Sequence, residues 1–149
     1  MNPPEKSIRD LIYNNYDIAD PAKASVNFPE IMRLDEYKKI ADRGKNMIWI
    51  EAEEAPMRPS TFAHMRVDQR CVVHILTKAA SGTNADVLAA NTRKQNMVDE
   101  VCQIILANGP TDAITEFIPR IAHLIDRTDI FMDPPLLAAD VVVKCVYLR

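Results

Sequence analysis

Residues 84–108 carry apolar side chains at the spacing of an α-helix. Apolar positions three or four residues apart line one side of a helix, and this segment has such a set. The set comprises Met97, Val98, Val101, Cys102, Ile104 and Ile105. Thr83 or Asn84 is suited to cap the start, and Gly109 followed by Pro110 is suited to end the helix. The remaining positions predict a solvated arc formed by Arg93, Lys94, Asp99, Glu100 and Gln103.

A shorter amphipathic helix is predicted near the start of the sequence. The segment PPEKSIRDLIYNNY places Ile8, Leu11 and Ile12 on one side of a helix. Its prolines fall at Pro3 and Pro4, in the first turn, where the missing N–H costs nothing.

Three segments have the composition and alternation of β-strands. HMRVDQRCVVHILTKA, residues 64–79, alternates apolar and polar in its first half and is apolar on both sides in its second half. That pattern is typical of a central strand covered in part on both faces. Shorter strands are predicted at residues 47–50 and 138–148. Pro56 and Pro59 break the chain after the first of these, because proline cannot donate to a sheet ladder.

Residues 111–127 fit either a helix or a strand. Their apolar spacing is helical, but Pro119 inside the segment would cost a helix about 3 kcal/mol. We therefore expect a short helical turn before Pro119 and a strand over residues 120–127. Residues 34–44 fit a marginal helix or an ordered loop equally well, and residues 26–32 include a short extended piece.

The order of these elements predicts an α+β fold in a single domain of residues 1–149. Strands that follow strands, with one long helix at about residues 84–108 and a short N-terminal helix packed on them, form a mainly antiparallel sheet with one helical layer. The last two strands are expected to pair. In the final strand Val141, Val143, Cys145 and Tyr147 would lie under the helix.

The opposite face of this sheet is also apolar. Its members are Val72, Leu76, Val142, Val146 and Leu148, interrupted by Asp140 and Lys144. A sheet with one helical layer normally has a polar outer face. Either the N-terminal segments cover this second face or another chain does.

Composition excludes several classes of protein. The net charge of −3 argues against a general nucleic-acid binder, although a local basic patch is allowed by the 18 Lys and Arg residues. Three glycines are too few for a dinucleotide-binding fingerprint or a Walker loop. No apolar run is long enough to span a membrane, and the start lacks a signal-peptide core, so a cytosolic protein is expected. Three separated cysteines, Cys71, Cys102 and Cys145, suit reduced, buried thiols.

The sequence contains no motif that specifies a reaction. His64, His74 and His123 each lack a second metal ligand at helical or strand spacing, and His74 suits a partly wet rim. Acidic residues gather at Glu51, Glu53 and Glu54 and again at Asp126, Asp129 and Asp133. Such carboxylates can bind Mg²⁺ or act as acids and bases, but they also suit solvated loops, and Arg127 between two aspartates favours local pairing.

In the order of its predicted elements and the breaks between them, the chain resembles tail terminator and tail-completion proteins from the neck of tailed viruses. The likeness runs from IRDLIYNNY through NMIWIEAEE, the proline loop and HMRVDQRCVVHILTKA. It continues through the helix with TRKQNMVDEVCQIIL to the strand pair RIAHLIDRTDIFMDPPLLAADVVVKCVYLR. It covers most of the chain from about Ile8, but residues 34–44 have no place in the pattern.

This resemblance implies a virion structural protein without enzymatic activity, assembled in the host cytoplasm. Copies would form a ring, usually a hexamer, that caps the tail tube and faces the head–tail connector. DNA would pass through the lumen without specific binding. No cofactor, metal, catalytic residue or membrane contact is implied. The alternative is a small cytosolic enzyme or ligand-binding domain that uses the acidic residues.

Interface residues are expected at three places. The proline loop offers Arg58 and Phe62, and the last loop offers Arg127, Asp129, Phe131 and Met132. An exposed Ile-Phe-Met tip suits a partner's pocket, although Phe131 and Met132 folding back onto the core is an equal alternative. The second sheet face offers Val142, Val146 and Leu148.

Overall fold

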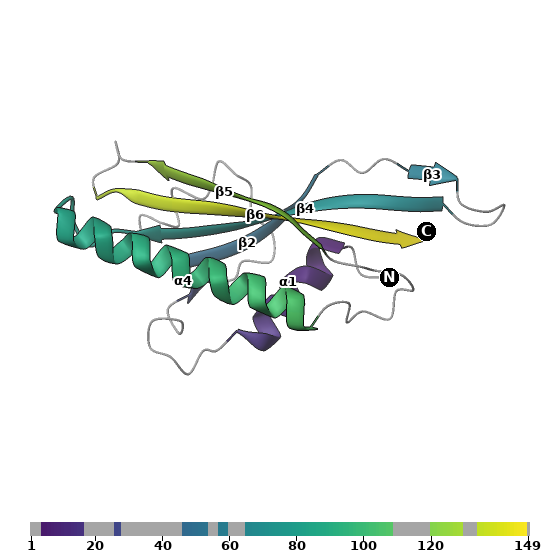
Figure 1. Ribbon diagram of the computed structural model, residues 1–149, viewed down its shortest axis with the longest axis horizontal. Coiled ribbons are helices and arrows are strands. Elements are labelled where there is room, and N and C mark those ends of the chain that lie inside the picture. Colours follow the sequence, from purple (N-terminus) through teal and green to yellow (C-terminus); the bar gives the residue numbers. More distant parts are fainter. Residues whose placement is uncertain are drawn as a thin grey trace.

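The structure is a computed structural model, shown in Figure 1. It describes residues 4–16, 26–27, 46–53, 57–59, 65–108, 120–129 and 134–148. The predicted loop or helix at residues 34–44, the helical turn before Pro119 and the Ile-Phe-Met tip lie outside these ranges.

The described elements confirm the predicted α+β class and most of its boundaries. The helices are α1 (Pro4–Asn15) and α4 (Asn84–Asn108). The strands are β1 (Val26–Asn27), β2 (Asn46–Ala52), β3 (Met57–Pro59), β4 (Met65–Lys78), β5 (Arg120–Asp129) and β6 (Leu136–Leu148). Residues 120–127, which fitted a helix or a strand, are therefore a strand.

All six described strands form one sheet in the order β1-β2-β4-β6-β5, with β3 paired to β4. Only the β1–β2 pairing is parallel, so the sheet is mainly antiparallel as predicted. The two longest strands, β4 and β6, lie side by side at its centre and pair along their whole lengths. Figure 1 shows β3 and the adjoining ends of β4 and β6 extending past the helices.

Both described helices pack on one face of the sheet. One cluster of buried side chains joins Ile8 and Ile12 of α1 to Val101 of α4 and to Val73 and Val141 of the central strands. This arrangement confirms the apolar faces predicted for both helices (Figure 1). Each large side chain in this layer contributes about 1.5–3 kcal/mol by leaving water.

The start of α4 is capped as expected. Thr83 Oγ1 accepts a hydrogen bond of 3.3 Å from the backbone N–H of Asp86, and the Thr83 carbonyl accepts one from Val87. Thr83 rather than Asn84 is therefore the capping residue.

Two of the residues predicted for the solvated arc of α4 turn toward the sheet instead. Lys94 is buried, and its Nζ lies 3.4 Å from Oδ1 of Asp126 on β5. Arg93 donates to the hydroxyl of Thr77 and to the carbonyl of Lys78 at the end of β4. Because these long side chains reach back over the strands, the expected arc is wrong at Lys94, and the charges of α4 anchor it to the sheet.

The proline-rich segment after β2 is not purely a break. Residues Met57–Pro59 form the short strand β3, in which Pro59 is opposite Met65 of β4. A proline is tolerated at the end of an edge strand, where its missing N–H removes no essential ladder bond.

Part of the second sheet face is buried within the single chain. Leu76 and Met47 are fully buried there, and Val142 is only 2% exposed. The chain itself, rather than another chain, therefore covers Val72, Leu76 and Val142. Val146, farther along β6, is partly exposed.

Candidate functional site

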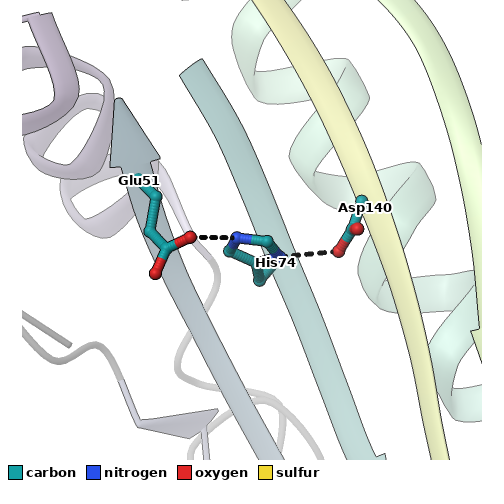
Figure 2. A network of polar contacts seen from close by, with 3 residues as sticks. All are labelled: Glu51, His74 and Asp140. Atoms are coloured by element: carbon teal, nitrogen blue, oxygen red, sulfur yellow. Dashed lines mark hydrogen bonds and ion pairs between the residues drawn. The ribbon is translucent and has the colours of Figure 1, made fainter. Parts of the chain in front are cut away.

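A histidine held between two carboxylates lies on the second face of the sheet. His74 Nδ1 is 2.7 Å from Asp140 Oδ1, and its Nε2 is 3.0 Å from Glu51 Oε2. Figure 2 shows the three side chains in a row across β2, β4 and β6. His74 is 5% exposed and Asp140 6%, whereas Glu51 reaches a partly exposed position.

Strand register brings these residues together. His74 is directly opposite Trp49 on one side and Asp140 on the other, and Glu51 is two residues farther along β2 than Trp49, on the same face. The rings of Trp49 and His74 stack with centroids 4.7 Å apart and an angle of 26° between their planes. The stacked indole and the two oxygens together fix the orientation of the imidazole. His74 is therefore a buried network residue, which corrects its predicted place at a wet rim.

The hydrogen bonding of this network requires two protons. An ionised carboxylate only accepts, so each ring nitrogen of His74 must donate to its own carboxylate oxygen. An imidazolium between two carboxylates satisfies both contacts and leaves the trio with one net negative charge. The alternative is a neutral ring with one carboxyl group protonated. In either state both ring nitrogens are engaged, so the network in this arrangement clamps three strands rather than offering a base to a substrate.

In the first acidic cluster, Glu51 belongs to this network and Glu53 is exposed to solvent. Glu51 belongs to strand β2 rather than to a loop, while Glu53 is exposed and lies 3.5 Å from Arg70. Across the described ranges, no group of three or more His, Cys, Asp or Glu side chains is placed to hold a metal ion. Glu54 and Asp133 lie outside those ranges.

The edge strand β5 is the second feature of interest. It pairs with β6 on one side and is the outermost strand of the sheet order. Leu124 on this strand is 45% exposed, and the carboxylate of Asp126 is 55% exposed although it pairs with buried Lys94. Asp126 thus has a partner in α4, while the predicted pairing with the neighbouring Arg127 involves a side chain outside those that the structure describes.

The three thiols are free, as predicted. Cys71 and Cys145 are buried on the helix side of neighbouring strands, and Cys102 is partly buried. A hydrogen bond that the neutral Cys71 thiol makes to the neighbouring Cys145 sulfur, together with burial, raises the pKa of Cys71 far above its usual value. Burial, reinforced by the charge of Asp99, raises the pKa of Cys102.

The predicted interface residues fall on separate parts of the molecule. Arg58 is in β3, Arg127 and Asp129 are in β5, and Leu148 ends β6; their side chains, and all of Phe62, Phe131 and Met132, lie outside what the structure describes. Of the other two, Val146 has a side chain that a partner could reach directly, whereas Val142 is covered by its own chain.

Comparison with models of known protein families gave no match, and no curated protein was found to be similar to the chain. None of the described helices has the length and apolar content needed to cross a bilayer.

Sequence reasoning missed the His74 network because its members are far apart in the chain. The available signal was Asp140, an acid that, with Lys144, interrupts a largely apolar strand face. A buried acid normally needs a partner, and only the register of β4 against β6 identifies that partner as His74.

Proposed function

We propose that the chain is a structural protein of a virion, a ring-forming tail terminator or head–tail joining protein of the neck. Copies would surround a lumen through which DNA passes, between the tail tube and the head–tail connector. The observation that best supports this role is that, among the described strands, each side of the sheet has an edge with little or no further pairing. The proposal also rests on the order of elements described for the sequence.

At one side of the sheet β5, ten residues long, is the outermost of the described strands, and among them it pairs with β6 alone. At the other side, β1 pairs with β2 only at Asn46 and Met47, so among the described strands none pairs with the outer edge of β2 beyond them. Exposed strand edges present unpaired N–H and C=O groups that readily accept another chain.

Strand directions favour joining these two edges between copies. Three successive antiparallel pairings separate β2 from β5, so β5 runs opposite to β2. Beside β2 of the next copy, β5 would therefore continue the antiparallel ladder. Such a contact joins two different surfaces, and repeated contacts of this kind close a ring when the rotation between copies permits.

The exposed side chains of β5 suit this contact. Leu124 would leave water against the next copy, where the partly buried Ile50 of β2 lies on the same face of the sheet. Because Leu124 is 45% exposed in the single chain, burying the rest of it contributes about 1 kcal/mol per contact.

The test is the mass and shape of the assembly. Light scattering after size exclusion, with electron microscopy, should detect rings of the full chain alone or with tail-tube and connector proteins. Leu124→Lys should reduce the ring fraction, while Tyr13→Gln on α1, which is 51% exposed, serves as the matched control. A protein that stays monomeric even with those partners would contradict the proposal.

A second candidate is a small enzyme or ligand-binding domain centred on Glu51. The observation in its favour is that this partly exposed carboxylate touches a buried His–Asp pair. Such a site should be stabilised by its ligand, because binding to the folded state alone raises the melting temperature. A thermal-shift series with Mg²⁺, Mn²⁺ and Zn²⁺ that leaves the melting temperature unchanged would count against a metal-dependent form of it.

A further inference from the structure

The outer side of α4 exposes two large apolar side chains. Leu106 is 73% exposed and Leu88 65%, the highest exposures among the large apolar residues that the structure describes. They are 18 positions apart, about five helical turns, so both lie along one line of the helix.

Between these leucines the exposed surface of α4 has few charges. Exposed positions recur alternately four and three residues apart, the spacing of a coiled-coil seam. They are Ala85, Ala89, Thr92, Asn96, Asp99, Gln103 and Leu106, which we call the α4 stripe. Asp99 is its one charged member. The stripe lacks the lysines and arginines usual on a solvated helix because Arg93 and Lys94 are turned toward the sheet.

We propose that the α4 stripe binds the α4 stripe of a second copy, with the two helices antiparallel about a two-fold axis near Asn96. Side-chain size increases along the stripe from Ala85 to Leu106, so reversing one copy brings its small end against the large end of the other. Ala85 would face Leu106 of the second copy, and Ala89 would face Gln103, so a small side chain meets a larger one at each step. Interdigitation of small and large side chains is what close helix packing requires.

The exposed leucines fit the same arrangement. The two-fold axis is perpendicular to the plane that contains both helix axes. A side chain above this plane in one copy therefore lies above it in the other copy as well. Leu88 of each copy therefore lies beside Leu106 of the other, and the pair buries four leucines in two equivalent contacts.

Charge selects the antiparallel direction. In a parallel, in-register pair Asp99 would face Asp99, which is unfavourable. In the antiparallel pair Asp99 faces Thr92, whose hydroxyl donates to the Leu88 carbonyl within the single chain. That hydroxyl can donate instead to the Asp99 carboxylate, and a hydrogen bond to a charged acceptor is the stronger of the two.

This contact is independent of the proposed ring. It joins identical surfaces, whereas a ring joins different ones, and it uses α4 rather than the sheet edges. In an assembly, it would place two copies, or two rings, face to face.

Cysteine cross-linking tests the arrangement directly. Asn96→Cys, in full-length protein carrying Cys102→Ala and Leu124→Lys to remove a competing thiol and weaken the ring contact, should form an intermolecular disulfide under mild oxidation. The yield should exceed several-fold that of Asn14→Cys, an exposed position on α1, in the same background. Ala85→Cys should cross-link no more than that control, because the two copies of Ala85 would lie about 30 Å apart.

Disruption supplies the second measurement. Adding Leu106→Glu should abolish the Asn96→Cys cross-link while leaving the circular dichroism spectrum unchanged, since Leu106 is exposed in the single chain. Cross-linking of Ala85→Cys above the control would indicate a parallel pair and overturn the proposal. A yield for Asn96→Cys equal to that of Asn14→Cys would overturn it as well.

Discussion

His74 and Asp140 are 66 positions apart in the sequence, yet they are directly opposite one another in the sheet, with 2.7 Å between Nδ1 and Oδ1. The bond crosses the two longest strands at a buried position, and Glu51 extends it to a third strand. An antiparallel ladder can slip by pairs of residues without changing which side chains face the core. A polar contact at one register position opposes such a slip.

Removing the buried acid should destabilise the fold strongly. Asp140→Ala leaves the His74 ring without its closest acceptor in a buried position. Leaving a buried polar group without its hydrogen-bond partner costs about 1–3 kcal/mol, and more if the group is charged. Urea unfolding followed by tryptophan fluorescence measures this, since Trp49 stacks on His74.

The matched control for that experiment is the exposed pair of Glu53 and Arg70. Glu53→Ala removes an ion pair whose side chains are 44% and 49% exposed, and such pairs contribute about 0–1 kcal/mol. Equal losses of stability in Asp140→Ala and Glu53→Ala would show that the network does not stabilise the sheet as we describe.

The pair of Lys94 and Asp126 should respond asymmetrically to substitution. Lys94→Met keeps the buried stem and leaves Asp126 exposed to water, so we expect a change within about 1 kcal/mol. Asp126→Ala leaves the buried ammonium group without this carboxylate and should cost about 1–3 kcal/mol. Thermal denaturation of both variants measures these losses of stability. A larger loss of stability in Lys94→Met than in Asp126→Ala would contradict this account.

The thiols should differ in reactivity under native conditions. Because its pKa is raised, Cys102 has a smaller thiolate fraction than an ordinary cysteine at pH 8, and the thiolate is the reactive form. Alkylation of Cys102 should therefore be slower than that of a free thiol and should accelerate as the pH rises toward its raised pKa. Cys71 and Cys145, fully buried, should react only after unfolding.

Mass spectrometry of the alkylated protein assigns each site. Rapid native labelling of Cys71 would mean that the helical layer opens far more readily than its packing implies.

The docking of α1 can be measured through Ile12. This side chain is fully buried in the cluster shared by both helices, and replacing a buried isoleucine by alanine costs about 2–5 kcal/mol. Asn14→Ala, at an exposed position two residues away, should change the free energy of unfolding by less than about 0.5 kcal/mol. Similar values for the two variants would place α1 outside the cooperative core.

Most of the fold could be predicted from the sequence because its elements have strong local patterns. The period of residues 97–105 identified α4, and the alternation around Cys71 and Val73 identified the central strand. Pro119 separated strand from helix for β5, which begins at the next residue. These features depend on neighbouring residues alone.

The parts that were missed depend on long-range pairing. Lys94 looked like a solvated residue because its helix position does not reveal Asp126 on a strand that comes later in the chain. His74 likewise looked isolated, since its carboxylates come from β2 and β6. Strand register and helix rotation decide these contacts, and neither is encoded in a local window of sequence.

The position of β6 has a consequence for folding. Among the described strands β6 is the last in chain order, yet it lies between β4 and β5 and pairs with both. During synthesis the β2–β4 pair and α4 can form early, but they leave one long side of β4 open until β6 emerges. Because the pairing of β6 with β4 joins segments distant in sequence, it should be slow. Until it occurs, the unpaired edge of β4 is where a nascent chain would need protection by a chaperone.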